Sequence, residues 1–245
     1  MIVLKLIVDI GNTITKAAIF DGWEIICVRY LKSDELCAIL EMGRQYKVSS
    51  AIISSVVKLG KNDVGIFDSL DAHVIRLSAA TPVPIKNRYS TPETLGNDRL
   101  AAVIGANYLM PGRNLAVIDC GTCITYDFID SDNCYFGGNI SPGINMRLKA
   151  LNAFTSRLPL VSADGDVPEL GDSTETAIRA GVIRGVEYEI KGYMAELSKK
   201  YKDLFVFLTG GDLFSFDTML KNSIFADKFL VLKGLNRILE YNGFR

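Results

Sequence analysis

Two short segments combine a carboxylate, a glycine and hydroxyl-bearing side chains in the same order. Asp9–Lys16 reads Asp-Ile-Gly-Asn-Thr-Ile-Thr-Lys, and Asp119–Thr125 reads Asp-Cys-Gly-Thr-Cys-Ile-Thr. Glycine lets the backbone approach a ligand closely, and successive backbone N–H groups can bind an anion. A carboxylate beside a phosphate commonly holds a hard cation. The two segments therefore indicate phosphate and cation binding, although two tight hairpins with structural glycines would carry the same letters.

The residue types give less support to a base-binding turn, a P-loop or a zinc site. A third glycine turn, 208–212, could pack its backbone against a planar base, but strand–Gly-Gly–helix connections are common for structural reasons. The chain lacks a Gly-x-x-x-x-Gly-Lys-Ser/Thr segment, so P-loop chemistry is not expected. His73 is the single histidine, which excludes a histidine-based zinc cluster. Cys120 and Cys123 have no second cysteine pair at zinc spacing, so we expect two small packed residues.

Hydrophobic periodicity predicts that each of the two segments joins a pair of strands. In the first half, strands are expected over 3–9, 14–20, 23–30, 50–56 and 73–77, and helices over 33–46, 63–70 and 98–109. In the second half, strands are expected over 115–119, 124–129, 135–140, 205–208 and 229–232. Helices there are expected over 145–154, 175–200 and 214–220, with one more at the C-terminus.

The two halves resemble each other in sequence as well as in the order of their elements. Residues 6–22 align without gaps on residues 116–132. The identities in this alignment are the pairs Asp9/Asp119, Gly11/Gly121, Ile14/Ile124, Thr15/Thr125 and Ile19/Ile129. This agreement favours internal duplication over chance similarity. It predicts two domains, 1–111 and 112–245, divided at a Pro-Gly turn.

The amino-acid composition is that of a globular protein and argues against a nucleic-acid partner or a membrane span. The 245 residues include 27 Lys+Arg and 28 Asp+Glu, a formal net charge of −1, so a nucleic-acid partner is not expected. Hydrophobic residues make up 49%, typical of a globular chain, but no run approaches the ~18–20 apolar residues of a membrane span. Five cysteines without framework spacing indicate a reduced, cytoplasmic protein.

Five motifs in order give the chain a close resemblance to the type III pantothenate kinases. That family belongs to the acetate kinase/sugar kinase/Hsp70/actin superfamily. The motifs are Asp9–Lys16, Gly96–Arg99, Asp119–Thr125, Gly137–Gly143, and Gly171–Thr174 followed by Ala177-Ile178. Cys123 departs from the alanine that many members carry, a residue of similar size. The resemblance implies an α/β fold with two ribonuclease-H-like domains from an internal duplication, the actin-like ATPase fold.

The resemblance also implies a reaction, in which ATP phosphorylates the terminal hydroxyl of pantothenate to give 4'-phosphopantothenate, the first step towards coenzyme A. Asp98 matches the proton acceptor. The residues that match ATP contacts are Asp9, Ile10, Gly11, Asn12, Thr13, Ile14, Thr15, Lys16 and Thr122. Those that match substrate contacts are Tyr89, Gly96, Asn97, Asp98, Arg99 and Thr174.

Cations and partners are implied in the same way. Asp119 matches the ligand of a monovalent cation, potassium or ammonium, and Asp9 would lie near magnesium. The residues alone do not separate these two metal roles. The family implies a homodimer that uses ATP and pantothenate, with no nucleic-acid or membrane partner.

Several assignments have structural alternatives. Asp98 could be only a helix N-cap worth ~1 kcal/mol. Arg99 could be a surface arginine and Tyr89 an ordinary loop aromatic. Thr174 could form a helix cap with Ser173.

Two other functions also compete with the pantothenate kinase. A non-catalytic regulator is one, since some relatives are described as accessory factors. The carboxylates Asp9, Asp98 and Asp119 argue against it, because a regulator does not need all three. The other is a superfamily kinase or phosphatase with a different small substrate. Such an enzyme would not need Tyr89 or the Gly96–Arg99 motif.

Overall fold

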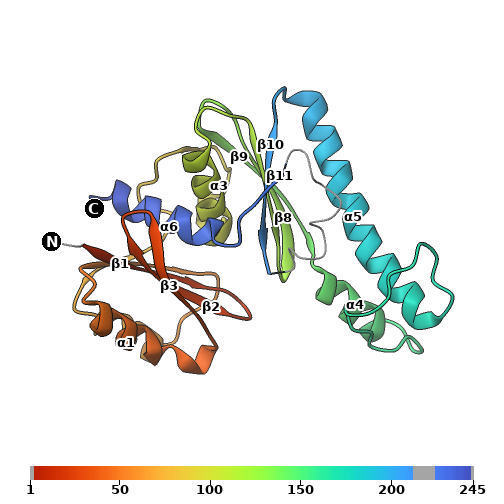
Figure 1. Cartoon of the computed structure of the whole chain (residues 1–245), viewed down its shortest axis with the longest axis horizontal. Coiled ribbons are helices and arrows are strands. Elements are labelled where there is room, and N and C mark those ends of the chain that lie inside the picture. Colours follow the sequence, from red (N-terminus) through yellow and green to blue (C-terminus); the bar gives the residue numbers. More distant parts are fainter. Residues whose placement is uncertain (1–2, 212–223, 244–245) are drawn as a thin grey trace. The chain divides into compact units, whose positions relative to one another are not determined.

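The computed structural model describes residues 3–211 and 224–243, which form two β-sheets with helices packed on them (Figure 1). The first sheet has the strand order β3-β2-β1-β4-β5. Strand β1 pairs antiparallel with β2 and parallel with β4, and β5 continues the parallel side. Its strands are β1 (Leu4–Ile10), β2 (Thr15–Asp21), β3 (Glu24–Leu31), β4 (Ser50–Ser55) and β5 (His73–Arg76).

The second sheet repeats this topology. Its order is β11-β10-β7-β8-β9-β6, so apart from the short edge strand β6 each strand takes the place of its counterpart in the first sheet. The strands are β6 (Lys86–Asn87), β7 (Leu115–Cys120), β8 (Cys123–Ile129), β9 (Cys134–Pro142), β10 (Phe205–Gly210) and β11 (Ile224–Ala226). The shared order confirms the predicted duplication of a ribonuclease-H-like sheet.

Contacts divide the chain into two compact units. The first comprises Met1–Gly112, Ile129–Gly137 and Phe229–Arg245, and the second comprises Arg113–Phe128 and Gly138–Lys228. The domains 1–111 and 112–245 remain a proposal about the origin of the two halves. They differ from the compact units at residue 112 and at residues 129–137 and 229–243, which belong to the first unit.

Helices cover both faces of the first sheet (Figure 1). Successive side chains of a strand point to opposite faces, so Leu6, Val8 and Ile10 pack into the cluster formed with α1 and α2. Asp9 therefore lies on the other face, where α3 and α6 pack together and contact β4. The helical segments of this unit are η1 (Ser33–Glu35), α1 (Cys37–Tyr46), α2 (Lys61–Asp68), η2 (Pro92–Thr94), α3 (Asn97–Leu109) and α6 (Leu230–Tyr241).

The predicted strand over 229–232 is wrong, because these residues form the start of α6. A short apolar run does not distinguish a buried strand from a buried helix, and α6 is buried on several sides. Gly234 lets α6 approach α3 closely, since an added Cβ would lie 1.8 Å from the Ala101 carbonyl oxygen. The predicted helix over 214–220 and Asp212 of the third glycine turn lie outside the described residues.

Contacts between residues distant in the chain fix α6 against the first sheet. Lys5 is only 1% exposed, and its Nζ lies 2.6 Å from Glu240 Oε1. Asn236 Nδ2 donates a hydrogen bond of 3.0 Å to the carbonyl of Gly22 in the β2–β3 turn. In the same turn region Trp23 stacks on Tyr108 of α3, with ring centroids 3.8 Å apart. These contacts make α3 and α6 part of one core with β1.

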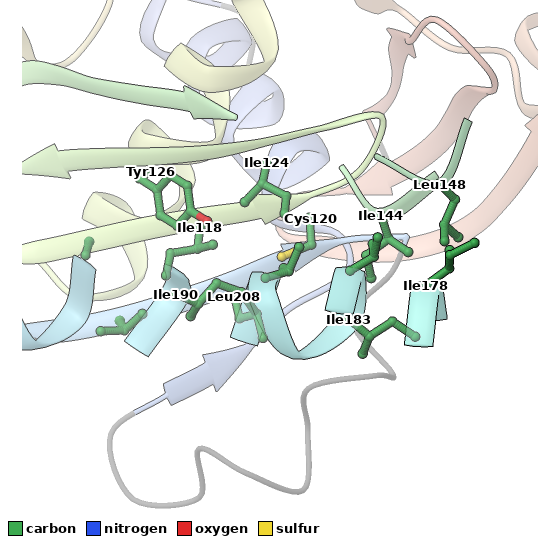
Figure 2. Packing of buried hydrophobic residues seen from close by; sticks show 14 of the residues in the cluster. Ile118, Cys120, Ile124, Tyr126, Ile144, Leu148, Ile178, Ile183, Ile190 and Leu208 are labelled. Carbon is green, nitrogen blue, oxygen red and sulfur yellow. The ribbon is translucent and has the colours of Figure 1, made fainter. Parts of the chain in front are cut away.

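In the second unit, α4 (Ile144–Ala153) and α5 (Thr174–Lys200) pack against side chains from β7, β8 and β10. Figure 2 shows this cluster, with the Cys120 sulfur among the aliphatic side chains that face α5. Cys120 is 1% exposed, as expected for a small packed residue. Within residues 3–211 and 224–243, no helix combines the length and apolar character needed to cross a membrane.

Candidate active site

The first glycine turn closes the β1–β2 hairpin tightly. The Gly11 N–H donates to the Ile14 carbonyl oxygen at 3.1 Å, and a Cβ on Gly11 would lie 2.9 Å from that oxygen. Asn12, Thr13 and Ile14 are exposed at its tip. A residue larger than glycine would therefore have to displace this turn, which the sequence predicts to bind phosphate.

Asp9 lies at the base of this hairpin in a buried environment. It pairs with Lys16 across the hairpin and with Ser54 on β4. Burial, followed by the nearby negative charge of Asp98, raises the pKa of Asp9 to about 6, although Lys16 opposes the shift. The structure thus brings together Asp9, Lys16 and Asp98, three residues that the sequence assigned to one site.

This environment fits a cation. Among the described residues, Asp9 Oδ1 and Ser54 Oγ are buried and have no hydrogen-bond partner by geometry, although the Ser54 hydroxyl is near enough to lower the pKa of Asp9 slightly. An unpartnered carboxylate oxygen near a second carboxylate is satisfied by a divalent cation, which also removes the like-charge repulsion. The described part of the chain has no cluster of three His, Cys, Asp or Glu ligands. Phosphate oxygens and water would therefore have to complete the octahedral coordination that magnesium requires.

Asp98 is the second residue of α3, whose N-cap is Gly96. The N-cap alternative for Asp98 is therefore wrong. Asp98 Oδ1 accepts a hydrogen bond of 2.8 Å from the backbone N–H of Arg99. A Cβ on Gly96 would lie 2.5 Å from the same oxygen. The glycine of the Gly96–Arg99 motif therefore makes room for the carboxylate.

Asn97 anchors the first turn of α3 to the sheet. Its side-chain amide donates to the carbonyl of Leu77, just after β5, at 3.2 Å, and to that of Ser55, at the end of β4, at 3.5 Å. The sequence assigned Asn97 to substrate binding. In this structure its amide holds the N-terminus of α3, and with it Asp98, at the carboxyl ends of two parallel strands.

Arg99 and Tyr89 form a second group in the same unit. Arg99 is 5% exposed, so it is not a surface arginine, and its guanidinium carbon lies 5.6 Å from the centre of the Tyr89 ring. The ring packs on Gly137, where an added Cβ would lie 2.6 Å from Tyr89 Cδ2. Gly137 also has φ +95°, which favours glycine. The Tyr89–Arg99 pair, predicted to bind substrate, is thus positioned partly by a residue of another motif.

The second glycine turn lies in the second unit and reproduces the first in two respects. Asp119 near the end of β7 is in register with Thr209 on the parallel strand β10, as Asp9 is with Ser54 on β4. Thr122 is exposed at the tip of the turn. A Cβ on Gly143 would lie 2.2 Å from the Gly121 carbonyl oxygen, so the end of β9 supports this turn closely.

Thr174 is the first residue of α5 and is exposed. The cap of this helix is Ser173, whose Oγ accepts a hydrogen bond of 3.2 Å from the Thr176 N–H. The capping function predicted for the pair therefore belongs to Ser173, and Thr174 is left with an exposed side chain beside the cap.

Sequence reasoning missed several residues that shape these turns. Ser54 lies at the end of a predicted strand, and only the register of β1 with β4 places it beside Asp9. Gly137 and Gly143 belong to a recognised motif, but their packing roles required the structure. Arg147 and Glu189, which support the end of β9, carried no sequence signal at all.

Comparisons with known proteins agree on one family. The sequence model of the family described as type III pantothenate kinase matches residues 5–196. A type III pantothenate kinase from Phocaeicola vulgatus is 57% identical over 239 residues, covering 98% of this chain and 99% of the relative.

Comparison with solved structures identifies proteins of similar fold. A candidate Baf-family transcriptional activator from Campylobacter jejuni has a TM-score of 0.64 at 23% identity, with 97% and 98% of the two chains covered. A glucokinase from an Antarctic psychrotroph has a TM-score of 0.56 at 14% identity, with 98% and 100% covered. At these identities the two structures show the fold alone.

Proposed function

This chain belongs to the type III pantothenate kinase family and catalyses the ATP-dependent phosphorylation of pantothenate in coenzyme A biosynthesis, and on that premise we propose which of its residues perform the reaction. The single observation that carries the proposal is the placement of two carboxylates, Asp9 and Asp98, close enough for the charge of one to raise the pKa of the other. One is buried with an unpartnered oxygen, and the other lies at the start of a helix anchored by Asn97.

In the proposed mechanism, the terminal hydroxyl oxygen of pantothenate attacks the γ-phosphorus of ATP. The bond from that phosphorus to the bridging oxygen breaks, ADP leaves, and the hydroxyl proton passes to Asp98. Phosphoryl transfer needs little covalent chemistry from the protein, so binding, orientation and charge neutralisation carry most of the catalysis. Asp98 suits the role of proton acceptor because its carboxylate lies in the first turn of α3, near enough to Asp9 to raise the pKa of that residue, and it is not the N-cap of the helix.

The remaining residues are proposed to bind and orient the two substrates. The turns Asp9–Lys16 and Asp119–Thr125, with Thr122 at the tip of the second, would hold the ATP phosphates. Arg99 would pair with the pantothenate carboxylate, while Tyr89, Gly96, Asn97 and Thr174 would contact or shape the pantothenate site. The contact between the Arg99 guanidinium and the Tyr89 ring supports this role, because it places two of the predicted substrate residues side by side.

Magnesium at Asp9 would neutralise charge on the transferring phosphate, and potassium or ammonium would bind at Asp119. The unpartnered Asp9 Oδ1 supports the first assignment. We expect turnover to be lost when EDTA removes magnesium, and to fall when sodium replaces potassium in a coupled ADP-release assay. Adding back ammonium is expected to restore activity. Magnesium-independent turnover, or full activity in buffer free of potassium and ammonium, would contradict these assignments.

We also propose that the enzyme is a homodimer. The second unit exposes large apolar side chains that a partner copy could cover, namely Ile140, Met146, Phe154, Leu160, Leu170 and Tyr188. Phe154 and Leu170 are 88% and 85% exposed.

Light scattering at micromolar concentration is expected to give twice the 26.9 kDa mass of one chain. Dilution should lower this mass only at concentrations below the dissociation constant. A mass of one chain throughout the micromolar range would overturn the dimer.

The Campylobacter jejuni protein of similar fold is described as a transcriptional activator, which would be a non-catalytic function. The presence of Asp9, Asp98 and Asp119 favours the kinase for this chain. Pantothenate-dependent ADP release by the purified protein distinguishes the two. A cytoplasmic location also belongs to this proposal, supported by five cysteines that form no disulfide in the described part of the chain.

A further inference from the structure

A polar network in the second unit connects α5 to the support of the second glycine turn. Its hub is Glu189, a half-buried carboxylate on α5. Glu189 Oε1 accepts hydrogen bonds from Tyr126 Oη at 2.8 Å and from Ser141 Oγ at 2.5 Å. Glu189 Oε2 lies 2.5 Å from a terminal nitrogen of Arg147. One carboxylate therefore ties together β8, β9 and α4.

The network holds the end of β9 at several points. Arg147 Nε donates to the Pro142 carbonyl oxygen at 2.7 Å, and a terminal nitrogen donates to Ser141 Oγ at 3.2 Å. The Arg147 backbone N–H also donates to the Gly143 carbonyl oxygen at 3.0 Å. The last two residues of β9, Ser141 and Pro142, are thus held by the side chain of Arg147, which is paired with Glu189.

The same end of β9 contacts the glycine turn directly. The Gly143 N–H donates to the Thr122 carbonyl oxygen at 3.1 Å. A Cβ on Gly143 would lie 2.6 Å from that oxygen, so the two backbones are in close contact. A shift of residues 141–143 would therefore move Thr122.

The negative charge of Glu189 makes the network sensitive to substitution of that residue. Burial tends to raise the pKa of Glu189, but hydrogen bonds from Ser141, Arg147 and Tyr126 outweigh it and hold the pKa below the usual range. Glu189 is thus ionised near neutral pH, and each oxygen accepts from a defined donor. In a glutamine at this position, one carboxylate oxygen is replaced by an amide NH₂ group, which can only donate. That group would face the side-chain donors of Ser141 and Tyr126 or of Arg147, and the corresponding hydrogen bonds would be lost.

We propose that Glu189 and Arg147 are positioning residues that hold the Gly121–Thr122 turn in its phosphate-binding geometry through the end of β9. The inference rests on the proposed role of Thr122 in binding ATP. Neither Glu189 nor Arg147 touches the reacting atoms in this account. Their effect on catalysis passes through Gly143 and the Thr122 backbone.

Glu189→Gln is the direct test. We expect the KM for ATP to rise by about tenfold or more, since small misplacements of binding groups weaken the contacts that depend on them. The KM for pantothenate should change less than about twofold. Hydrogen–deuterium exchange should be faster in the peptides that cover residues 119–125 and 141–147, because the Gly143 N–H loses its fixed acceptor.

Two control variants separate positioning from general destabilisation. Glu196→Gln makes the same chemical change on α5 at an exposed pair with Lys199 and should alter neither readout. Ile190→Val removes one buried methyl next to Glu189 and leaves the network intact. If Ile190→Val raises the KM for ATP as much as Glu189→Gln does, the positioning role is overturned.

Thr122→Ala distinguishes failure of this inference from failure of the proposed function. If it raises the KM for ATP, Glu189→Gln added to it should have little further effect, because both changes act on one contact. Additive effects, or unchanged exchange in residues 119–125 and 141–147, would overturn the positioning role. If Glu189→Gln speeds exchange but neither variant changes the KM for ATP, the ATP role of Thr122 is wrong, and the kinetic part of the inference falls with it.

Discussion

Replacing Asp98 by asparagine is expected to lower turnover by at least about a hundredfold while the protein stays folded. A positioned base typically contributes ~10²–10⁴-fold, and the chain has no histidine near this position to replace it. Asparagine is nearly isosteric and can still accept the Arg99 N–H with its side-chain oxygen. ATP affinity should survive, because Asp98 lies outside both glycine turns.

Stability gives this variant a second, independent signature. Removing the Asp98 charge lowers the pKa of Asp9, because the charge of Asp98 helps to raise it. The variant should therefore be at least as stable as the wild type at pH 8 in urea unfolding. Trp23, the single tryptophan, packs in the same unit and reports that unfolding. Asp63→Asn in the first turn of α2 is the matched control, and it should leave turnover unchanged. Near-normal turnover of Asp98→Asn would remove Asp98 from the role of base.

Asp9→Asn is expected to abolish magnesium-dependent turnover and yet stabilise the metal-free protein at neutral pH. In the folded protein the pKa of Asp9 is about 6, against an ordinary value of 3.8, because burial and Asp98 disfavour its charge. The folded state therefore binds the proton more tightly than the unfolded chain does. Its stability falls as pH rises from about 4 to about 6, and the deficit persists above pH 6.

The shift of about two pKa units corresponds to roughly 3 kcal/mol of unfolding free energy. Asparagine carries no charge, so the variant should exceed the wild type by up to about this amount at pH 8 and by little at pH 4. Urea unfolding of both proteins at the two pH values, followed by Trp23 fluorescence, measures the difference. A stability difference that is independent of pH would contradict the assignment.

Magnesium provides a further control for Asp9. The cation should raise the melting temperature of the wild type, because binding to the folded state alone stabilises it. Asp9→Asn should lose most of that response. An equal response in both proteins would mean that magnesium binds elsewhere.

Local patterns predicted much of the first unit. The Asp-x-Gly segment at residue 9 was expected between two strands, and β1 and β2 have those positions. The helix predicted from residue 98 begins one residue earlier, at Asn97. These features depend on turn chemistry and hydrophobic period, which are properties of neighbouring residues.

Features that depend on distant partners could not be predicted in this way. Lys5 reads as an interruption of an apolar strand, and only the fold places it against Glu240, 235 residues away. The run from residue 229 was mistaken for a strand because its burial comes from α3 and the first sheet. Glu189 lies on a long, largely polar helix, and its partners Tyr126, Ser141 and Arg147 are 42–63 residues away. Register and packing, rather than local pattern, determine these contacts.

The most direct test of the proposed chemistry is to measure 4'-phosphopantothenate and ADP together, with the wild type and Asp98→Asn at saturating ATP, magnesium and potassium. The account predicts one phosphopantothenate per ADP from the wild type, no ADP release above background without pantothenate, and almost no product from an Asp98→Asn protein that still binds ATP. Equal ADP release by the wild type with and without pantothenate, or near-normal product formation by Asp98→Asn, would contradict it.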